Sequence, residues 1–316
     1  MKYRLLGALA LSAGISLLSG LGMSAYAEEN GQQPYPGGLN TIAAGLVPAL
    51  GHSQFYMYNQ YANTTKFMGD NGKELFSHFH ADSLAVVPRF LYTLPEKAGP
   101  FTVTMGGSMT FLNLNMRTSG GDGHIFGLCD LNPEFRLGWN NKKHNFFLLL
   151  GMDFFLPTGS YSQTRIVNLG LNYWTFQPNI SFTYFMNRNL ALESTTVINF
   201  NTTNHATGYH SGTNIVSDYA LNYYPNAPVL PNLYLGVAGY TQEQIQNDTR
   251  DGQVVDNIDG IAVSRGFRGR VFGIGPQIGL RLFKTGGILI KYTHQFDARN
   301  VTQGEEFWFE WSVPLS

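Results

Sequence analysis

The stretch that decides the fold runs from Leu156 to Tyr184 and reads LPTGSYSQTRIVNLGLNYWTFQPNISFTY. Apolar and polar residues alternate through its second half, from Tyr173 onward. Side chains of an extended strand point alternately to opposite faces, so this segment has one apolar and one polar face. The alternation is long enough to cross a hydrocarbon layer, which takes roughly 9–11 tilted residues. A half-buried strand of a soluble sandwich and a membrane strand with one face in lipid both fit it.

The first 27 residues have the pattern of a secretory signal peptide. Lys2 and Arg4 precede an apolar core, and the small-x-small tripeptide Ala25–Ala27 predicts cleavage before Glu28. No later stretch approaches the roughly 18 continuous apolar residues of a spanning helix. An exported chain of this kind is either soluble or a β-barrel, because closed barrels also satisfy every backbone group in lipid.

Composition favours the barrel. The 316 residues include 36 Gly, 23 Phe and 17 Tyr, and only 13% are charged, whereas about 25% is usual for a soluble domain. Without Lys2 and Arg4 the chain has 18 basic and 21 acidic residues, a net charge of −3 that gives no reason to expect nucleic acid as a partner. Cys129 is the single cysteine, so neither an internal disulfide nor a cysteine-based metal site fits.

Extended segments recur from His52 onward, and their connections alternate between short and long. Bacterial outer-membrane barrels have an even number of strands, short periplasmic turns and longer extracellular loops. The pattern therefore predicts an all-β fold, a transmembrane antiparallel β-barrel of about 12 strands over residues 52–316. The expected strands are 52–66, 79–94, 100–115, 126–139, 144–156, 171–185, 189–202, 213–224, 231–243, 267–282, 287–298 and 305–315; the expected long loops are 67–78, 116–125, 157–170, 203–212, 244–266 and 299–304.

Residues 28–51 precede the expected barrel and show no period. They are rich in Gly and Pro, including Pro34, Pro36 and Gly37. We interpret them as an N-terminal segment that lies at the periplasmic mouth or enters the lumen as a plug. A flexible tail fits the same composition.

Charged residues within the expected strands fall on the polar face. A charge that faced lipid at the midplane would cost about 2–4 kcal/mol, so these side chains should point into the lumen. Because both signs occur, we expect them to pair and brace the wall. The inward charges are Arg89, Glu134, Arg136, Asp153, Glu193, Asp218, Arg281, Lys291 and Glu310.

Several short motifs occur along the chain in a recognisable order and spacing. The Gly-x-x-Pro-x-x-Gly block corresponds to Gly45–Gly51, the Leu-Pro-Thr-Gly-x-Tyr motif to Leu156–Tyr161, and a Trp-Thr-Phe-Gln-Pro block lies within Asn168–Pro178. Further blocks are Ser211-Gly212 with Asp218–Leu221, Leu235–Tyr240, and Gly273–Pro276. Together these motifs resemble those of the meta-pathway phenol-degradation family of outer-membrane proteins, and the resemblance extends over nearly the whole chain after the signal peptide. It implies an outer-membrane channel associated with the uptake of hydrophobic or aromatic compounds, without naming the compound.

Three groups of residues could suggest other chemistry. His210-Ser211 and His52-Ser53 resemble parts of an esterase, but neighbouring strand residues project to opposite faces and cannot form a nucleophile–base pair. His78, His80 and Asp82 share a face and could contact a metal or substrate, although a solvated edge fits better. Four aspartates of loop 244–266 could bind a divalent cation through oxygen, but their spacing matches no calcium loop: Asp248, Asp251, Asp256 and Asp259.

The sequence thus predicts a monomeric outer-membrane channel, without enzymatic activity or cofactor, for passive uptake of a small hydrophobic or aromatic molecule. Residues 28–51 and loop 157–170 would form the constriction. The last strand would be the signal read by the barrel assembly machinery, and outer-membrane lipid would surround the wall. A structural or adhesive barrel with ligand-binding loops is the alternative, followed by an esterase or phospholipase. The expected substrate-binding residues are Phe147, Asp153, Phe155, Tyr161, Arg165, Tyr173 and Trp308.

Overall fold

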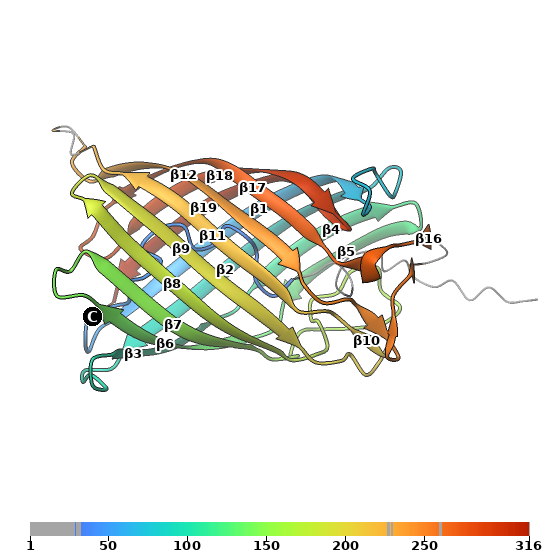
Figure 1. Ribbon diagram of the computed structural model, residues 1–316, viewed down its shortest axis with the longest axis horizontal. Helices are drawn as coiled ribbons and strands as arrows, with labels where there is room; N and C mark the ends of the chain where they lie inside the picture. Colours follow the sequence, from blue (N-terminus) through green and yellow to red (C-terminus); the bar gives the residue numbers. More distant parts are fainter. Residues whose placement is uncertain (1–28, 30–32, 226–227, 229, 259–260, 316) are drawn as a thin grey trace, which may run out of the picture.

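The computed structural model describes residue 29 and residues 33–225, 228, 230–258 and 261–315. The signal peptide predicted for residues 1–27 lies outside this part of the chain. The described residues form a closed antiparallel barrel of 12 strands (Figure 1). The first strand pairs with both the second and the last, and this closes the ring.

The wall follows the order of the chain. Its segments are β1 (Ser53–Met68), β2 (His80–Thr93), β3 (Thr102–Ser108), β4 (Phe111–Thr118), β5 (Gly121–Leu128), β6 (Asn132–Asn140), β7 (Phe146–Phe155), β8 (Thr175–Asn187), β9 (Leu190–Asn201), β11 (Asn214–Tyr223), β12 (Leu233–Gln244), β17 (Arg270–Arg281), β18 (Gly287–Arg299) and β19 (Val301–Pro314). Short pieces lie in the loops: β10 (Tyr209–His210), β13 (Thr249–Arg250), β14 (Gln253–Val254), β15 (Asn257–Ile258), β16 (Ile261–Ala262) and the 3-10 turn η2 (Arg265–Phe267). Within the described residues, no helix has the length and apolar character needed to cross a membrane.

Two of the 12 strands are interrupted. β3 and β4 are halves of one strand, and their interruption lies opposite Pro88 of β2; β5 and β6 are halves of the next strand, interrupted beside Met109 and Thr110. Proline has no N–H to donate to a ladder. Pro88 still accepts a hydrogen bond from Met109 N (3.2 Å), and Thr110 O accepts one from Cys129 N (2.8 Å), so the wall stays joined across the gap.

The predicted faces of β8 are confirmed. Phe176 and Ile180 on the apolar face are 40% and 46% exposed, whereas Gln177 on the other face is fully buried. Aromatic rings gather near the turn end of this part of the wall, where Phe146 contacts Trp139 and Tyr184. Aromatic belts at the two lipid–water interfaces are typical of membrane barrels. The exposed apolar face of β8 therefore faces lipid.

Two of the predicted long loops are wrong. Residues 299–304 form a tight turn in which Asn300 adopts a positive φ of 51° between β18 and β19. Residues 116–125 mostly belong to β4 and β5, which continue to another tight turn. Both strand pairs extend to the outer end of the barrel, where polar side chains also point outward, as His294 does toward Glu305 (2.7 Å). The outward residues change from apolar to polar before these strands end, so the apolar alternation that predicts a strand stops too early.

The start of β8 also differs from the prediction, which placed it at residue 171. Residues 156–174 form a loop against the inner side of β5, where Gly123 leaves room for Ile166 and Val167. Asp130 holds this loop by accepting hydrogen bonds from Gly159 N (2.8 Å) and Leu171 N (2.9 Å). Backbone donors satisfied by a distant carboxylate replace the ladder expected here.

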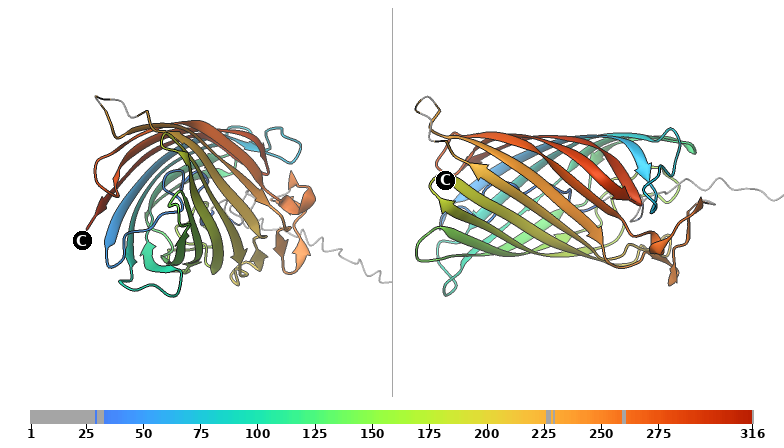
Figure 2. Two further views of the ribbon diagram at one scale, coloured as in Figure 1. Left: turned by 60° about the vertical axis from the view of Figure 1, so that its left-hand side comes forward. Right: turned by 45° about the horizontal axis from the view of Figure 1, so that its top comes forward.

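Long loops gather at the end of the barrel opposite the C-terminus (Figure 2). The largest buried apolar cluster lies there and includes Phe67, Phe76, Phe79, Tyr209 and Phe267. It joins the loop after β1 to the segments between β12 and β17. Because longer loops are extracellular in outer-membrane barrels, we assign this end to the cell surface and the opposite end to the periplasm.

Candidate functional site: a divided lumen

The lumen contains two cavities of similar size. The outer cavity, toward the long loops, has a volume of about 360 Å³, and the inner cavity, toward the periplasm, about 370 Å³. Apolar atoms make up most of the exposed lining of the outer cavity, whereas the lining of the inner cavity is only slightly more apolar than polar and includes Arg188, Arg281 and Lys284. The mixed, mainly apolar lining of the outer cavity is typical of small-molecule sites.

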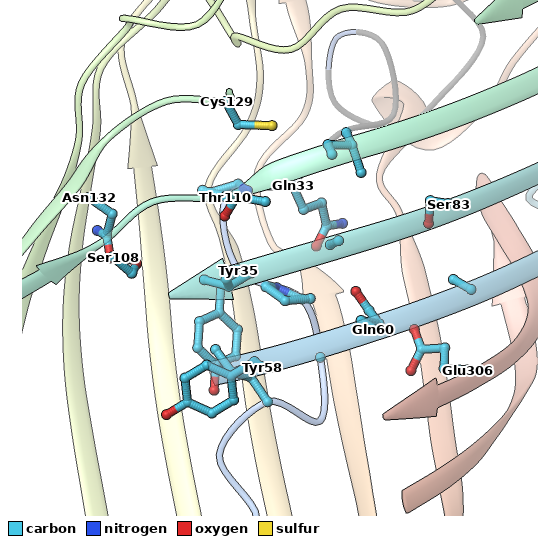
Figure 3. Close-up of a pocket in the computed structure, with 18 of the residues that line it drawn as sticks. Gln33, Tyr35, Tyr58, Gln60, Ser83, Ser108, Thr110, Cys129, Asn132 and Glu306 are labelled. Carbon is cyan, nitrogen blue, oxygen red and sulfur yellow. Dashed lines mark hydrogen bonds between the residues drawn. The ribbon is translucent and has the colours of Figure 1, made fainter. Parts of the chain in front are cut away.

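Six residues line both cavities and therefore form the partition between them. Four belong to the wall, and two belong to the segment that precedes β1. Figure 3 shows Tyr35 and Tyr58 close together at this point, one from each source. The partition consists of Tyr35, Asn40, Tyr58, Arg89, Arg136 and Asp153.

The wall part of the partition is a continuous ion network. Arg89 donates to both carboxylate oxygens of Glu134, at 2.7 and 2.5 Å, and also to the hydroxyl of Tyr58 at 3.1 Å. Arg136 lies 2.6 Å from Glu134 and also donates to Asp153, with Nη2 3.0 Å from Oδ2. Bidentate guanidinium–carboxylate pairs are directional and strong. The expectation that inward charges pair is confirmed for these four residues.

The other part of the partition is held by Asp218 of β11. Its carboxylate accepts hydrogen bonds from the hydroxyl of Tyr35 (2.5 Å), Gly38 N (2.6 Å) and Asn40 N (2.8 Å). Asn40 also donates to the hydroxyl of Tyr35 (2.9 Å). One buried carboxylate thus orients two of the partition residues, and its partner is a chain segment about 180 residues away.

After Asn40, the chain that precedes β1 follows the wall toward the periplasm. Ala44 N donates to Glu193 (3.0 Å), and Gly45 N donates to the Thr183 hydroxyl (2.9 Å). A Cβ atom at Gly45 would lie 2.4 Å from the Phe147 carbonyl and 2.5 Å from Thr183 N. Only glycine allows the backbone to approach the wall this closely.

The chain that precedes β1 also contacts β17 and β18, on the other side of β11. Thr41 donates to Gln277 (2.8 Å) and accepts from Lys291 (3.2 Å), while Lys291 pairs with Glu310 (2.9 Å). Lys291 also donates to the carbonyl of Gly38. Residues 33–50, named here the lumenal segment, therefore contact the wall from β8 to β18. Figures 1 and 2 show it inside the ring of strands.

Glu29 lies among the extracellular loops. Its carboxylate accepts hydrogen bonds from Thr207 (2.6 Å), Asn204 (2.7 Å) and Tyr161 (3.2 Å). Burial raises the pKa of Glu29, and these donors offset part of the rise. Burial and the nearby Glu29 together raise the pKa of Tyr161 to about 12, so its hydroxyl remains a donor at neutral pH.

Three of the predicted substrate-binding residues line a cavity. Phe155 and Trp308 line the outer cavity, and Asp153 lines both. Asp153 already pairs with Arg136, which favours a role in the partition. Phe147 is placed at the periplasmic end against Phe185, at a centroid distance of 6.1 Å, and lines neither cavity.

The other three lie in the loop before β8, outside the linings of both cavities. Tyr161 contacts Glu29, and Tyr173 donates to Ser211 (3.3 Å). Arg165 is exposed and donates to Ser160 (2.9 Å). Sequence reasoning missed Asp218 and Glu193 as anchors of the lumenal segment. The sequence signal for this role was an acidic residue on the inward face of a strand whose neighbouring residues are uncharged.

The groups considered for other chemistry have different partners. Ser211 is fully buried, and its hydroxyl oxygen accepts from Tyr173 and from Glu29 N (3.1 Å). His80 contacts Asp82 (2.7 Å) on the outer side of β2. Asp248 accepts from Tyr209 (2.5 Å), whereas Asp259 lies outside the described residues. Among the residues that the structure describes, no three His, Cys, Asp or Glu side chains are grouped to hold a metal ion.

A closed barrel with a lipid-facing apolar surface, long loops at one end and a hollow lumen defines the class of outer-membrane β-barrels. The model of the family described as "Putative MetA-pathway of phenol degradation" matches residues 64–311, and the chain belongs to this family. The resemblance noted in the sequence is therefore confirmed. No curated protein matches the chain by sequence.

One solved outer-membrane channel shares the fold, and other solved barrels show a weaker similarity. An outer-membrane channel from Pseudomonas putida F1 is similar with a TM-score of 0.72 and 14% identity, covering 88% of this chain and 100% of that one. A Pseudomonas aeruginosa FadL homologue has a TM-score of 0.41 and 8% identity, covering 93% of this chain and 97% of that one. The NanC porin has a TM-score of 0.43 and 9% identity, covering 83% and 99%.

Proposed function

We propose that this protein is an outer-membrane channel that passively admits small hydrophobic or aromatic molecules. The observation that carries the proposal is the lumen itself, which holds a mainly apolar outer cavity and a more polar inner cavity in series, separated by six residues. The family and the similar P. putida channel support the same function. Binding free energy would come chiefly from burial of the apolar surface of the solute, about 25 cal/mol per Å².

The charges of the lumen support a neutral solute over an ion. Arg89, Arg136 and Lys291 each pair with a carboxylate inside the wall. Paired charges of both signs leave no strong field of one sign at the partition, whereas Arg188, Arg281 and Lys284 line the inner cavity toward the periplasm. We propose that the lumenal segment is the plug, and that passage between the cavities requires the partition to move.

The chain would act without catalysing a reaction. The similar structures are channel and porin barrels, and the Ser211 hydroxyl is engaged by Tyr173 and Glu29. We further propose that the barrel is a monomer, surrounded by outer-membrane lipid and inserted by the barrel assembly machinery. Ordered loops at the outer end, with an open hollow lined by His205, His210 and Asp251, keep a ligand-binding or adhesive barrel as the second candidate.

Uptake by liposomes tests the proposal. Vesicles with the purified full chain should take up labelled toluene and phenol faster than empty vesicles, with little uptake of a sugar of similar mass. Equal uptake by protein-containing and empty vesicles for every hydrophobic solute would reject the channel. In that case, binding of cell-surface material by the loops would favour the second candidate.

A further inference from the structure

One side of the outer cavity has polar atoms without hydrogen-bond partners. Trp308 Nε1 and Glu306 Oε2 face each other, but the contact between them does not reach the geometry of a full hydrogen bond, and among the described residues neither atom has another partner. Both side chains are buried, at 2% and 6% exposure, and both line the cavity. Unpaired buried polar groups cost free energy, so a native site of this kind calls for an additional partner.

The two carboxylate oxygens of Glu306 differ in their hydrogen bonds. Oε1 accepts hydrogen bonds from Gln295 (3.0 Å) and Tyr240 (3.3 Å), so only Oε2 needs a donor. Trp308 Nε1 is a donor and needs an acceptor. Residues two apart on a strand share a face, and these two both point into the lumen. One hydroxyl group can accept from the indole and donate to the carboxylate at the same time.

The wall beside this pair is hollow because three of the four residues next to it, Ala62, Ser83 and Ala85, are small. In the register of the strands, Glu306 is opposite Ala62 of β1, which is opposite Ser83 of β2. In the adjacent row, Trp308 is opposite Gln60, which is opposite Ala85. Figure 3 shows Gln60, Ser83 and Glu306 around the same space.

The next strand provides an apolar surface. Ser83 is opposite Leu114 and Ala85 is opposite Leu112, and both leucines line the outer cavity. A molecule with its hydroxyl at Trp308 and Glu306 would place its apolar body along the small residues toward these leucines. The cavity volume of about 360 Å³ has room for a body of one or two rings.

The local charges favour a neutral molecule. Lys291 lies 4.6 Å from the centre of the Trp308 ring, but it is paired with Glu310. An anionic ligand would find no unpaired cation beside these two residues, so the burial of its charge there would be costly. A hydrocarbon without a hydroxyl would leave both polar atoms unpaired.

We propose that the outer cavity contains a hydroxyl-recognition site, in which Trp308 and Glu306 bind the hydroxyl group of a neutral molecule with an apolar body. The inference rests on the proposed channel function and adds the substrate class. It makes Trp308 and Glu306 specificity-determining residues for the compounds that enter the outer cavity.

Three probes with the same methylbenzene body test the site: p-cresol, p-xylene and p-toluate, which carry a hydroxyl, a methyl and a carboxylate group. Calorimetric titration of the full chain in detergent, with empty micelles as the blank, should show saturable binding of p-cresol that exceeds that of the other two. Trp308→Phe should weaken p-cresol binding roughly three- to tenfold and leave p-xylene unchanged. Thr110→Val removes another hydroxyl of the same cavity and should have no effect.

A steric variant covers the case in which Trp308→Phe folds poorly. Ala62→Leu keeps both polar atoms but fills the hollow, so p-cresol binding should be lost. Equal binding of p-cresol and p-xylene, or an equal loss of both in Trp308→Phe, would overturn the site while uptake by vesicles could persist. Selective p-cresol binding without any uptake would instead retain the site and reject the channel.

Discussion

On the wall formed by β2, β6 and β7, buried charges pair with one another, whereas on the wall formed by β9 and β11 they hold the lumenal segment. Arg89, Glu134, Arg136 and Asp153 form a closed ion network. Glu193 and Asp218 instead accept hydrogen bonds from backbone N–H groups of residues 38–44. The first arrangement makes a rigid wall, and the second makes a segment whose attachment depends on a few removable contacts.

The largest effect is expected from breaking the rigid side. Arg136→Met leaves Asp153 without its guanidinium partner in a buried site, and removal of one member of a buried pair costs about 3–5 kcal/mol. The urea midpoint of the refolded barrel should fall accordingly. Arg165→Met, which removes an exposed guanidinium, should leave the midpoint within error. An unchanged midpoint in Arg136→Met would mean that the ion network does not stabilise the wall.

The ion network and the attachment of the lumenal segment also differ in how far the sequence predicts them. The alternation around Gln177 and the inward position of Arg136 follow from a period of two, so the barrel and its charged interior were predictable. The lumenal segment has no period, and its partners are about 180 residues away. Nothing local in Gly38 or Asn40 specifies a carboxylate on β11.

The cavities were equally hidden from the sequence. Trp308 was recognised as inward, but its unpaired N–H and the hollow beside Ala62 depend on the register between β1 and β19. The break opposite Pro88 was predictable in principle, because proline cannot donate to a ladder. The tight turn at Asn300 was missed because polar outward residues resemble a loop.

Asp218→Ala tests the attachment of the lumenal segment to the wall. Tyr35, Gly38 and Asn40 lose their shared acceptor, and hydrogen bonds to a charged group contribute roughly 1.5–3 kcal/mol. Amide exchange of residues 35–40 should therefore accelerate about tenfold or more, while the urea midpoint of the barrel changes less than in Arg136→Met. Asp82→Asn, on the outer side of β2, is the matched control. Exchange that stays as slow as in the wild type would show that Asp218 does not hold the segment.

A smaller effect on the same side is expected from Gly45→Val. The new side chain meets the Phe147 carbonyl and Thr183 N at less than 3 Å, and overpacking of this kind costs about 1–3 kcal/mol. Residues 43–46 should leave the wall while the Tyr35 anchor remains, so amide exchange should rise only in that part of the segment. A uniform rise along the whole segment would mean that the contacts act as one unit.

The smallest effect concerns Glu29 at the extracellular end. Because burial raises its pKa, the folded loops bind the proton more tightly than the unfolded chain does. Their stability should be greatest below the ordinary pKa of a glutamate and should decline as the pH rises through the raised value. Glu29→Gln keeps an acceptor and should remove this pH dependence. Amide exchange near Asn204 and Thr207 at several pH values measures it, and a pH dependence that persists in the variant would assign the titration to another group.

The central claim is that the lumenal segment keeps the two cavities apart and so makes the channel selective. Conductance and solute uptake of the full chain, compared with a chain that lacks residues 28–50, test it most directly. The deletion should raise ion conductance several-fold and admit a hydrophilic sugar that the full chain excludes, while p-xylene uptake persists. Unchanged conductance and continued exclusion of the sugar would contradict the claim.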